Sequence, residues 1–167
     1  MIKIKADVQR VLIAGIGDTL ISEEVCSTLK TYALGSCVAV MAWDKKLKIG
    51  GMIHIALPDS KIDPEKAKAR PGYFADTGIP DLIEKLEKLG AKKENLQVKI
   101  AGGAETMHFI KTMEIGKKNT EACRQIFKIL NISIEAEDTL GKNARTIAFF
   151  INDGTCEIQS LDNKKNL

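Results

Sequence analysis

The sequence has few cysteines, few aromatic residues and no long apolar run. Four cysteines occur in 167 residues and none forms a CxxC pair, which excludes a zinc ribbon and argues against a disulfide framework. No stretch approaches the ~18 consecutive apolar residues of a transmembrane helix. Residues 1–7 lack the charged-then-apolar order of a signal peptide. These absences favour a cytoplasmic protein with free thiols and no membrane insertion.

Neither sign of charge dominates the sequence. The 25 basic residues are interleaved with 22 acidic ones, and the formal net charge of +3 is too small to predict binding to nucleic acid. A hydrophobic content of 44% with 28% charged residues is ordinary for a globular protein. Because no repeat or linker marks a boundary, we expect one domain over residues 1–167, with a core from about residue 8 to residue 160.

Short apolar runs separated by turns predict an α+β fold with an antiparallel-rich sheet. The pattern indicates about seven strands and two helices. The strands are expected within residues 8–16, 30–34, 37–43, 49–57, 97–101 and 132–136, and in a hairpin formed by residues 145–151 and 155–159.

Capping residues predict where the two helices begin. Asp76 or Thr77 is expected to cap the first helix, with Pro80 in its first turn, and Asn119 is expected to cap the second. The charged residues 60–73 are expected to form a long surface loop, and such loops often carry function.

Cys37 differs from the other cysteines because it follows Gly35-Ser36 where a loop becomes a strand. Backbone N–H groups at such a junction can stabilise a thiolate and a developing oxyanion. If the next turn centres on residues 45–46, Cys37 directly opposes His54, with Cβ atoms roughly 4.5–5.5 Å apart. The spacing therefore predicts a nucleophile and a general base on one face of a hairpin, provided that the register is right.

Structural roles stay open for these residues. A cysteine in an apolar run is often a small buried hydrophobe, and His108, after the glycine turn, is a competing base. Thr31 could accept the second imidazole N–H and orient His54, or be an ordinary strand threonine.

Three further positions are candidates for substrate contact. Gly102-Gly103 lacks the spacing of a phosphate-binding motif and predicts either a loop lining the substrate cleft or a tight structural turn. Tyr73 and Asp76, at the end of the long loop, are expected to contact the substrate, although Asp76 could equally serve only as a helix cap.

Several segments together resemble the CheD family of chemoreceptor glutamine deamidases. The likeness runs from about residue 11 to residue 160, in order and spacing. It is carried by residues 31–40 (TYALGSCVAV), His54 with residues 57–60 (LPDS), residues 73–77 (YFADT), residues 99–104 (KIAGGA), Ile115-Gly116 with Asn119, residues 136–139 (AEDT) and residues 143–145 (NAR).

The resemblance implies roles for individual residues. Cys37 matches the family's nucleophile, His54 its general base and Thr31 the residue that orients the histidine. The implied fold is an α/β/β sandwich similar to the catalytic domains of deamidating toxins, with no metal or cofactor. The implied substrate is glutamine on the cytoplasmic helical domain of methyl-accepting chemotaxis receptors, and the implied partner is the CheC-type phosphatase. Gly35, Ser36, Gly102 and Gly103 are expected to surround the oxyanion and the substrate.

The sequence departs from the family pattern at two places. Glu105-Thr106 are extra residues after the glycine loop, and Leu140 stands where glycine is common. Both are expected to affect the choice of substrate more than the chemistry.

Two other functions compete with the deamidase. An adaptor would bind the phosphatase and receptor helices, with catalysis secondary, and ammonia release from a receptor peptide separates it from an enzyme. A thiol protease is disfavoured because no segment indicates an extended peptide groove.

Overall fold

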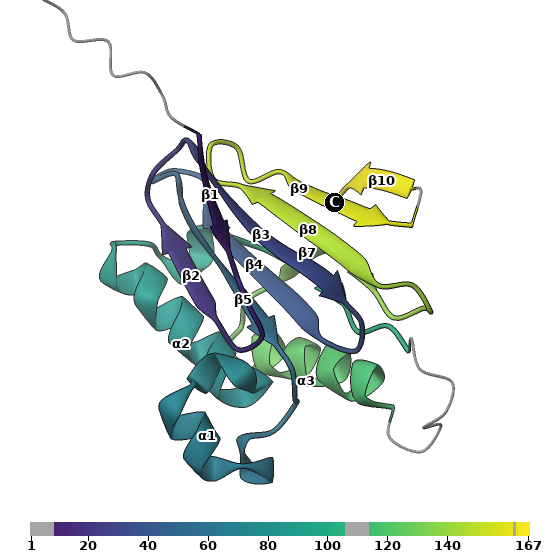
Figure 1. The fold of residues 1–167 in the computed structure, drawn as a ribbon. Coiled ribbons are helices and arrows are strands. Elements are labelled where there is room, and N and C mark those ends of the chain that lie inside the picture. Colours follow the sequence, from purple (N-terminus) through teal and green to yellow (C-terminus); the bar gives the residue numbers. More distant parts are fainter. Residues whose placement is uncertain (1–8, 106–113, 162) are drawn as a thin grey trace, which may run out of the picture.

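The computed structural model describes residues 9–105, 114–161 and 163–167. Two five-stranded sheets face each other, and α2 (Ala75–Lys88) and α3 (Ile115–Ile129) cover the outer face of one of them (Figure 1). The layers are therefore helix, sheet and sheet, which confirms the predicted α/β/β sandwich.

Each sheet mixes strands from distant parts of the chain. The helix-covered sheet has the order β2 (Thr19–Ser22), β5 (Ile49–Ile55), β4 (Val38–Asp44), β6 (Leu96–Gly102) and β7 (Ile134–Thr139). The second sheet has the order β1 (Arg10–Ile13), β3 (Ser27–Leu34), β8 (Arg145–Phe150), β9 (Cys156–Ser160) and β10 (Asn163–Asn166). Among the described strands only β1–β3 and β6–β7 pair in parallel, so the antiparallel-rich expectation is confirmed.

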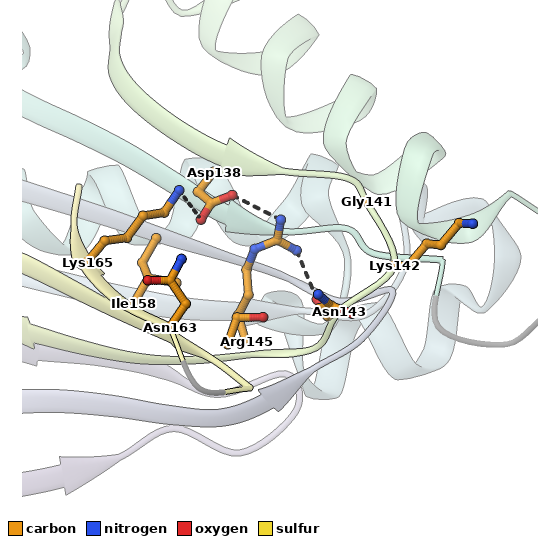
Figure 2. Close-up of a pocket in the computed structure, with 9 residues that line it drawn as sticks. Asp138, Gly141, Lys142, Asn143, Arg145, Ile158, Asn163 and Lys165 are labelled. Carbon is orange, nitrogen blue, oxygen red and sulfur yellow. Dashed lines mark hydrogen bonds and ion pairs between the residues drawn. The ribbon is translucent and has the colours of Figure 1, made fainter.

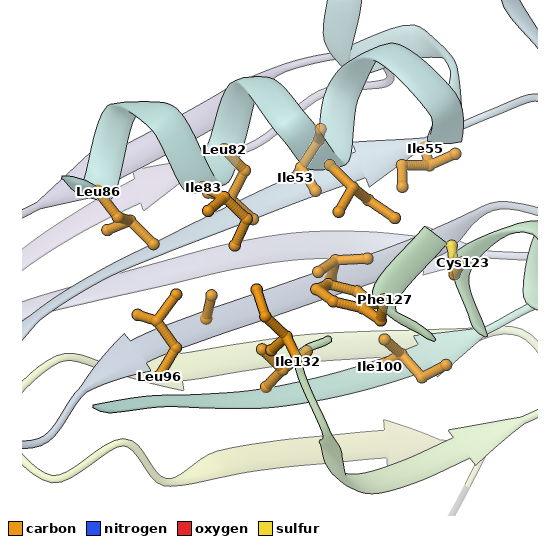
Figure 3. Close-up of a cluster of buried hydrophobic side chains, with 14 of the residues drawn as sticks. Ile53, Ile55, Leu82, Ile83, Leu86, Leu96, Ile100, Cys123, Phe127 and Ile132 are labelled. Carbon is orange, nitrogen blue, oxygen red and sulfur yellow. The ribbon is translucent and has the colours of Figure 1, made fainter. Parts of the chain in front are cut away.

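The side chains of β4 alternate between two hydrophobic cores. Val38 and Val40 face the helices, where Leu82, Leu86 and Phe127 complete one cluster (Figure 3). The alternate residues of β4, Ala39, Met41 and Trp43, face the second sheet. They pack in a second cluster with residues of β3, β8 and β9. A strand buried on both faces reads as a continuous apolar run, which is why residues 37–43 predicted a buried strand.

The long segment before α2 contains more structure than predicted. Residues 60–73 were expected to be a loop, but they form η1 (Ser60–Ile62), α1 (Pro64–Ala69) and η2 (Pro71–Tyr73). Asp63 caps α1 by accepting the Lys66 N–H at 3.0 Å, and Pro64 occupies the first helical position. These start signals were present in the sequence, but a helix of six residues is too short for periodicity to indicate it.

The predicted helix starts were wrong. α2 begins at Ala75 after Phe74, so Asp76 and Thr77 lie inside the helix and Pro80 falls in its second turn. α3 begins at Ile115, which places Asn119 within its first turns instead of at its cap. The short strands β2 and β10 and the short η3 (Lys93–Asn95) were not predicted either.

Candidate active site

His54 and Thr31 meet across the space between the two sheets. Thr31 belongs to β3 of one sheet and His54 to β5 of the other, and Thr31 Oγ1 lies 2.8 Å from His54 Nδ1. Both side chains are buried, at 0% and 5% exposure. The structure therefore brings these two predicted site residues together, although they are 23 positions apart in sequence.

The hydrogen bonds of Thr31 fix which imidazole nitrogen carries the proton. Its single hydroxyl hydrogen is donated to the Ala14 carbonyl at 2.9 Å, since a carbonyl can only accept. Thr31 Oγ1 must then accept the bond from His54, so Nδ1 carries the hydrogen. Nε2 is left as a bare lone pair, buried and without a hydrogen-bond partner among the described residues. This is the tautomer that a general base needs.

Cys37 lies diagonally across from His54, not directly opposite. Asp44 pairs with Ile49 around a four-residue turn, so Ala39 opposes His54 and the predicted register was wrong by two residues. Asp44 stabilises this longer turn by accepting the Lys46 N–H at 2.9 Å. Because side chains alternate with a period of two, the slip leaves Cys37 on the same face as His54. Diagonal neighbours are separated by roughly 7–8 Å between Cα atoms, and the small Ala39 side chain leaves space between them.

The loop formed by residues 35–37, which we call the 35–37 loop, is held by its carbonyl groups. The Gly35 carbonyl accepts from Ala104 N–H at 2.8 Å, and the Cys37 carbonyl accepts from Gly103 N–H at 2.8 Å. The Ser36 carbonyl accepts from Asn119 Nδ2 at 2.9 Å. In a trans peptide the N–H points away from the preceding carbonyl, so the N–H groups of Ser36 and Cys37 face away from these partners. Neither N–H donates a hydrogen bond within the described residues.

Gly102 and Gly103 press directly against this loop. Their φ angles of 118° and 66° favour glycine. A Cβ atom on Gly102 would lie 2.3 Å from the Cys37 carbonyl oxygen. The close backbone approach that the glycine pair predicted is thus made by the protein's own 35–37 loop. Gly103 N–H donates to the Cys37 carbonyl, whereas the N–H groups of Ser36 and Cys37 donate to no group among the described residues.

Burial moves the pKa values of the thiol and the imidazole in opposite directions. Burial raises the pKa of Cys37 above 9.0. Burial also lowers the pKa of His54 below 6.5, and the Ala14 carbonyl and the Asp18 charge only partly offset this effect. Both shifts favour the neutral forms of the thiol and the imidazole over a thiolate–imidazolium pair.

Tyr73 and Asp76 make their contacts with other parts of the protein. The Tyr73 ring packs on Gly17 and carries the Lys66 ammonium 3.9 Å from its centroid. Asp76 accepts hydrogen bonds from the backbone and hydroxyl of Ser60 at 2.9 and 2.7 Å, and so ties η1 to α2. Substrate contact by Tyr73 and Asp76 stays a prediction.

A partly buried ion pair between Arg145 and Asp138 supports the far side of the glycine loop (Figure 2). Arg145 donates to Asp138 at 2.9 Å and to the Leu140 carbonyl at 2.8 Å, beside a pocket of about 200 Å³. Leu140 N–H in turn donates to the Gly102 carbonyl at 2.8 Å. Burial raises the pKa of Asp138, but hydrogen bonds from Arg145 and Lys165 outweigh this effect and lower it below its ordinary value. Arg145 therefore fixes the turn that holds Gly102.

Some predicted positions and candidate ligands need separate mention. His108 and Thr106 lie outside the described residues, whereas Glu105 is described and its N–H donates to the Gly141 carbonyl at 2.9 Å. Within the described ranges no group of three His, Cys, Asp or Glu side chains could hold a metal ion.

Sequence reasoning missed three residues that shape the site. The Ala14 carbonyl sets the hydrogen-bond direction of Thr31. The Asp18 carbonyl accepts a hydrogen bond from the His54 backbone N–H at 3.1 Å. Asn119 was expected to be only a helix cap, but its side chain reaches the 35–37 loop. No local pattern signals the first two contacts, because they arise from the packing of β1 and β2 against the core.

The fold and the site first define a class: an α/β/β sandwich with a threonine-oriented histidine and a thiol on the same face of a hairpin. Comparison with known proteins then gives the family. Residues 56–160 match the family model described as CheD chemotactic sensory transduction. The chain belongs to the CheD family.

Curated relatives match nearly the whole chain. A protein of Syntrophus aciditrophicus, called probable chemoreceptor glutamine deamidase CheD 1, is 44% identical over 89% of this chain and 93% of its own length. The chemoreceptor glutamine deamidase CheD of Thermotoga maritima is 39% identical over 93% of this chain and 95% of its own. The crystal structure of the Bacillus licheniformis hypothetical protein YfiH has a TM-score of 0.48 and 13% identity, over 81% of this chain and 61% of YfiH. No helix of the described residues is long and apolar enough to cross a membrane.

Proposed function

We propose that this protein is a chemoreceptor glutamine deamidase. It hydrolyses glutamine side chains on methyl-accepting chemotaxis receptors to glutamate and ammonia. The observation that carries the proposal is the hydrogen-bonded state of His54: Thr31 accepts its Nδ1 hydrogen and leaves Nε2 as a free base on the face that Cys37 shares. Membership of the CheD family and the names of its curated relatives support the same activity.

The chemistry follows from these groups. His54 Nε2 takes the Cys37 proton, and the thiolate sulfur bonds to the carboxamide carbon of glutamine. The oxygen of that carbon becomes an oxyanion, which is bound by the N–H groups of Ser36 and Cys37, since these donate to no group among the described residues. The C–N bond breaks as His54 returns its proton to the leaving nitrogen, which departs as ammonia. Water, deprotonated by His54, then attacks the thioester and releases glutamate and the thiol.

Thr31 acts on the base and not on the substrate. A hydroxyl stabilises the imidazolium that forms during proton transfer less strongly than a carboxylate would, because it carries no charge. The site therefore suits a thiol, which needs less help from its base than an alcohol nucleophile does.

The remaining predicted residues and partners belong to the same proposal. Gly35 and Gly102-Gly103 hold the 35–37 loop at the substrate cleft, while Tyr73 and Asp76 contact the receptor. The substrate is the cytoplasmic helical domain of the receptor, which places the enzyme in the cytoplasm, and a CheC-type phosphatase is its partner. Residues 1–167 form one deamidase domain.

The test uses a purified receptor cytoplasmic fragment as substrate. Wild-type protein should release ammonia and raise the mass of receptor peptides by about 1 Da at glutamine. Cys37→Ala and His54→Asn should do neither and should keep the wild-type circular dichroism spectrum. Cys26→Ala, which removes a half-buried thiol elsewhere, is the matched control and should leave the rate unchanged.

The outcomes separate an enzyme from an adaptor. Full activity of Cys37→Ala would remove the mechanism. Binding of the receptor fragment by wild-type protein with no mass gain would favour the adaptor.

A further inference from the structure

Asn119 connects the segment that carries Cys37 with the segment that follows His54. Its amide nitrogen donates to the Ser36 carbonyl at 2.9 Å and to the Ala56 carbonyl at 2.9 Å. Ser36 directly precedes Cys37, and Ala56 lies two residues beyond His54. One buried side chain, with 0% exposure, therefore spans the segments that carry the thiol and the imidazole.

The assignment of the amide is fixed by its partners. Both are carbonyl oxygens and can only accept, so the NH₂ group must face them. Asn119 Oδ1 is buried and has no hydrogen-bond partner among the described residues. A buried polar atom left unpaired destabilises the folded state. The two hydrogen bonds donated by the Asn119 amide to the Ser36 and Ala56 carbonyls offset this destabilisation.

The two donors act on the geometry of the reaction. By holding the Ser36 carbonyl, Asn119 fixes the plane of the Ser36–Cys37 peptide, whose N–H faces the other way and is free. By holding the Ala56 carbonyl, it fixes the end of the segment that follows β5. Cys37 directly precedes Val38, the first residue of β4, and is not paired in the β4–β5 ladder. Strand pairing alone therefore does not set its position.

We infer that Asn119 is a positioning residue that locks the 35–37 loop to the end of β5 and thereby sets the approach of the Cys37 thiol to His54. This inference rests on the proposed roles of Cys37 and His54. Asn119 touches neither reacting group, and it acts through the two carbonyls that it holds. In the free protein the thiol and His54 Nε2 make no hydrogen bond. A small shift of the loop is then enough to take the thiol out of reach, and a misplacement of about 1 Å can cost about 100-fold in rate.

The test is a double-mutant cycle on the alkylation of Cys37 by chloroacetamide. The thiol sulfur displaces chloride to form a thioether, and the thiol proton passes to His54 or to buffer. Rates are measured on the Cys37 peptide by mass spectrometry for wild type, His54→Asn, Asn119→Ala and the double variant. His54 should accelerate alkylation in the wild type by about 100-fold. Asn119→Ala should reduce that acceleration to about twofold and should change the His54→Asn rate little.

Two further variants keep the result clear. Cys123→Ala is the matched control, because Cys123 is buried on the same helix and its loss leaves a small cavity without touching either carbonyl. It should retain the full acceleration by His54. Asn119→Asp has nearly the same shape but can donate one hydrogen at most. It replaces Asn119→Ala in the cycle if the alanine variant does not fold.

The outcomes are decisive in either direction. An Asn119 variant that slows wild type and His54→Asn by the same factor would have a structural role only, and the inference would be overturned. Equal alkylation rates for wild type and His54→Asn would also overturn it. His54 would then not accelerate the reaction of Cys37, and Asn119 would have no such acceleration to support. The alkylation assay uses chloroacetamide and no receptor. Its result can therefore be interpreted even if the protein does not deamidate the receptor. If deamidation occurs, Asn119→Ala should lower kcat about 10- to 100-fold and change KM by less than about twofold.

Discussion

Replacing Thr31 by valine tests the orientation of the base most directly. Valine has nearly the shape of threonine, so packing at this fully buried position is kept and only the hydroxyl is lost. The change removes the 2.8 Å contact with His54 Nδ1 and the 2.9 Å bond to the Ala14 carbonyl. His54 then loses the hydroxyl that accepts its Nδ1 hydrogen and favours the tautomer with a free Nε2.

The contacts set the size of the effect. Two buried polar groups, His54 Nδ1 and the Ala14 carbonyl, lose the Thr31 hydroxyl, and at about 1–3 kcal/mol each the free energy of unfolding should fall by about 2–6 kcal/mol. During catalysis the imidazole is charged, and a hydrogen bond to a charged group contributes about 1.5–3 kcal/mol. We therefore expect kcat to fall about 10- to 150-fold, with KM little changed.

The assay measures ammonia release from a receptor fragment alongside urea unfolding. Thr31→Ser keeps a hydroxyl and should recover most of kcat. Thr28→Val is the matched control, because Thr28 is buried on the same strand and makes no hydrogen bond to His54. If Thr31→Val lost stability but kept wild-type kcat, the tautomer argument would be refuted.

Three further predictions concern pH, strain and packing. Because burial lowers the pKa of His54, the acidic limb of kcat/KM in a pH–rate profile should lie below the ordinary histidine pKa of about 6.5. The unfolded chain binds this proton more readily, so His54 should also make stability decline as the pH falls through 6.5 towards its folded pKa, and His54→Asn should remove that slope in urea melts. Leu140 has a φ of 67°, and Leu140→Gly should raise the free energy of unfolding by about 1 kcal/mol; a decrease of that size would show that the leucine side chain matters more than its strain. Gly102→Ala should destabilise by about 2–3 kcal/mol and abolish ammonia release, since its Cβ would lie 2.3 Å from the Cys37 carbonyl; a wild-type rate would contradict the role assigned to that contact.

The sequence could predict which strands carry the site, but not their register. Residues 37–43 and 49–57 are apolar runs on either side of a charged turn, and they do form the adjacent strands β4 and β5. The hairpin turn is longer than assumed because Asp44 accepts two N–H groups within it. Cys37 and His54 still share a face because the error was an even number of residues.

Contacts between the layers were beyond the reach of local patterns. Thr31 meets His54 only because two sheets pack face to face, and no hydrophobic period encodes which positions then coincide. Asn119 illustrates the same limit: an asparagine before a helical pattern is an ordinary cap signal, yet here it is buried inside α3 and holds two distant carbonyls. The family resemblance supplied the role of Thr31, which spacing alone left open.

Burial disfavours a preformed thiolate–imidazolium pair in the site. It raises the pKa of Cys37 and lowers that of His54, so each shift opposes proton transfer before substrate arrives. The N–H groups of Ser36 and Cys37 donate to no group among the described residues and are available to the oxyanion, which exists after the sulfur has bonded to carbon. Stabilisation is thus concentrated at the transition state and not in the free protein, which is where it accelerates the reaction. A buried neutral thiol reacts slowly with small electrophiles and oxidants unless His54 takes its proton, because the thiolate is the reactive form. The same burial that slows accidental chemistry at Cys37 therefore leaves the reaction dependent on a carboxamide that can occupy the oxyanion position.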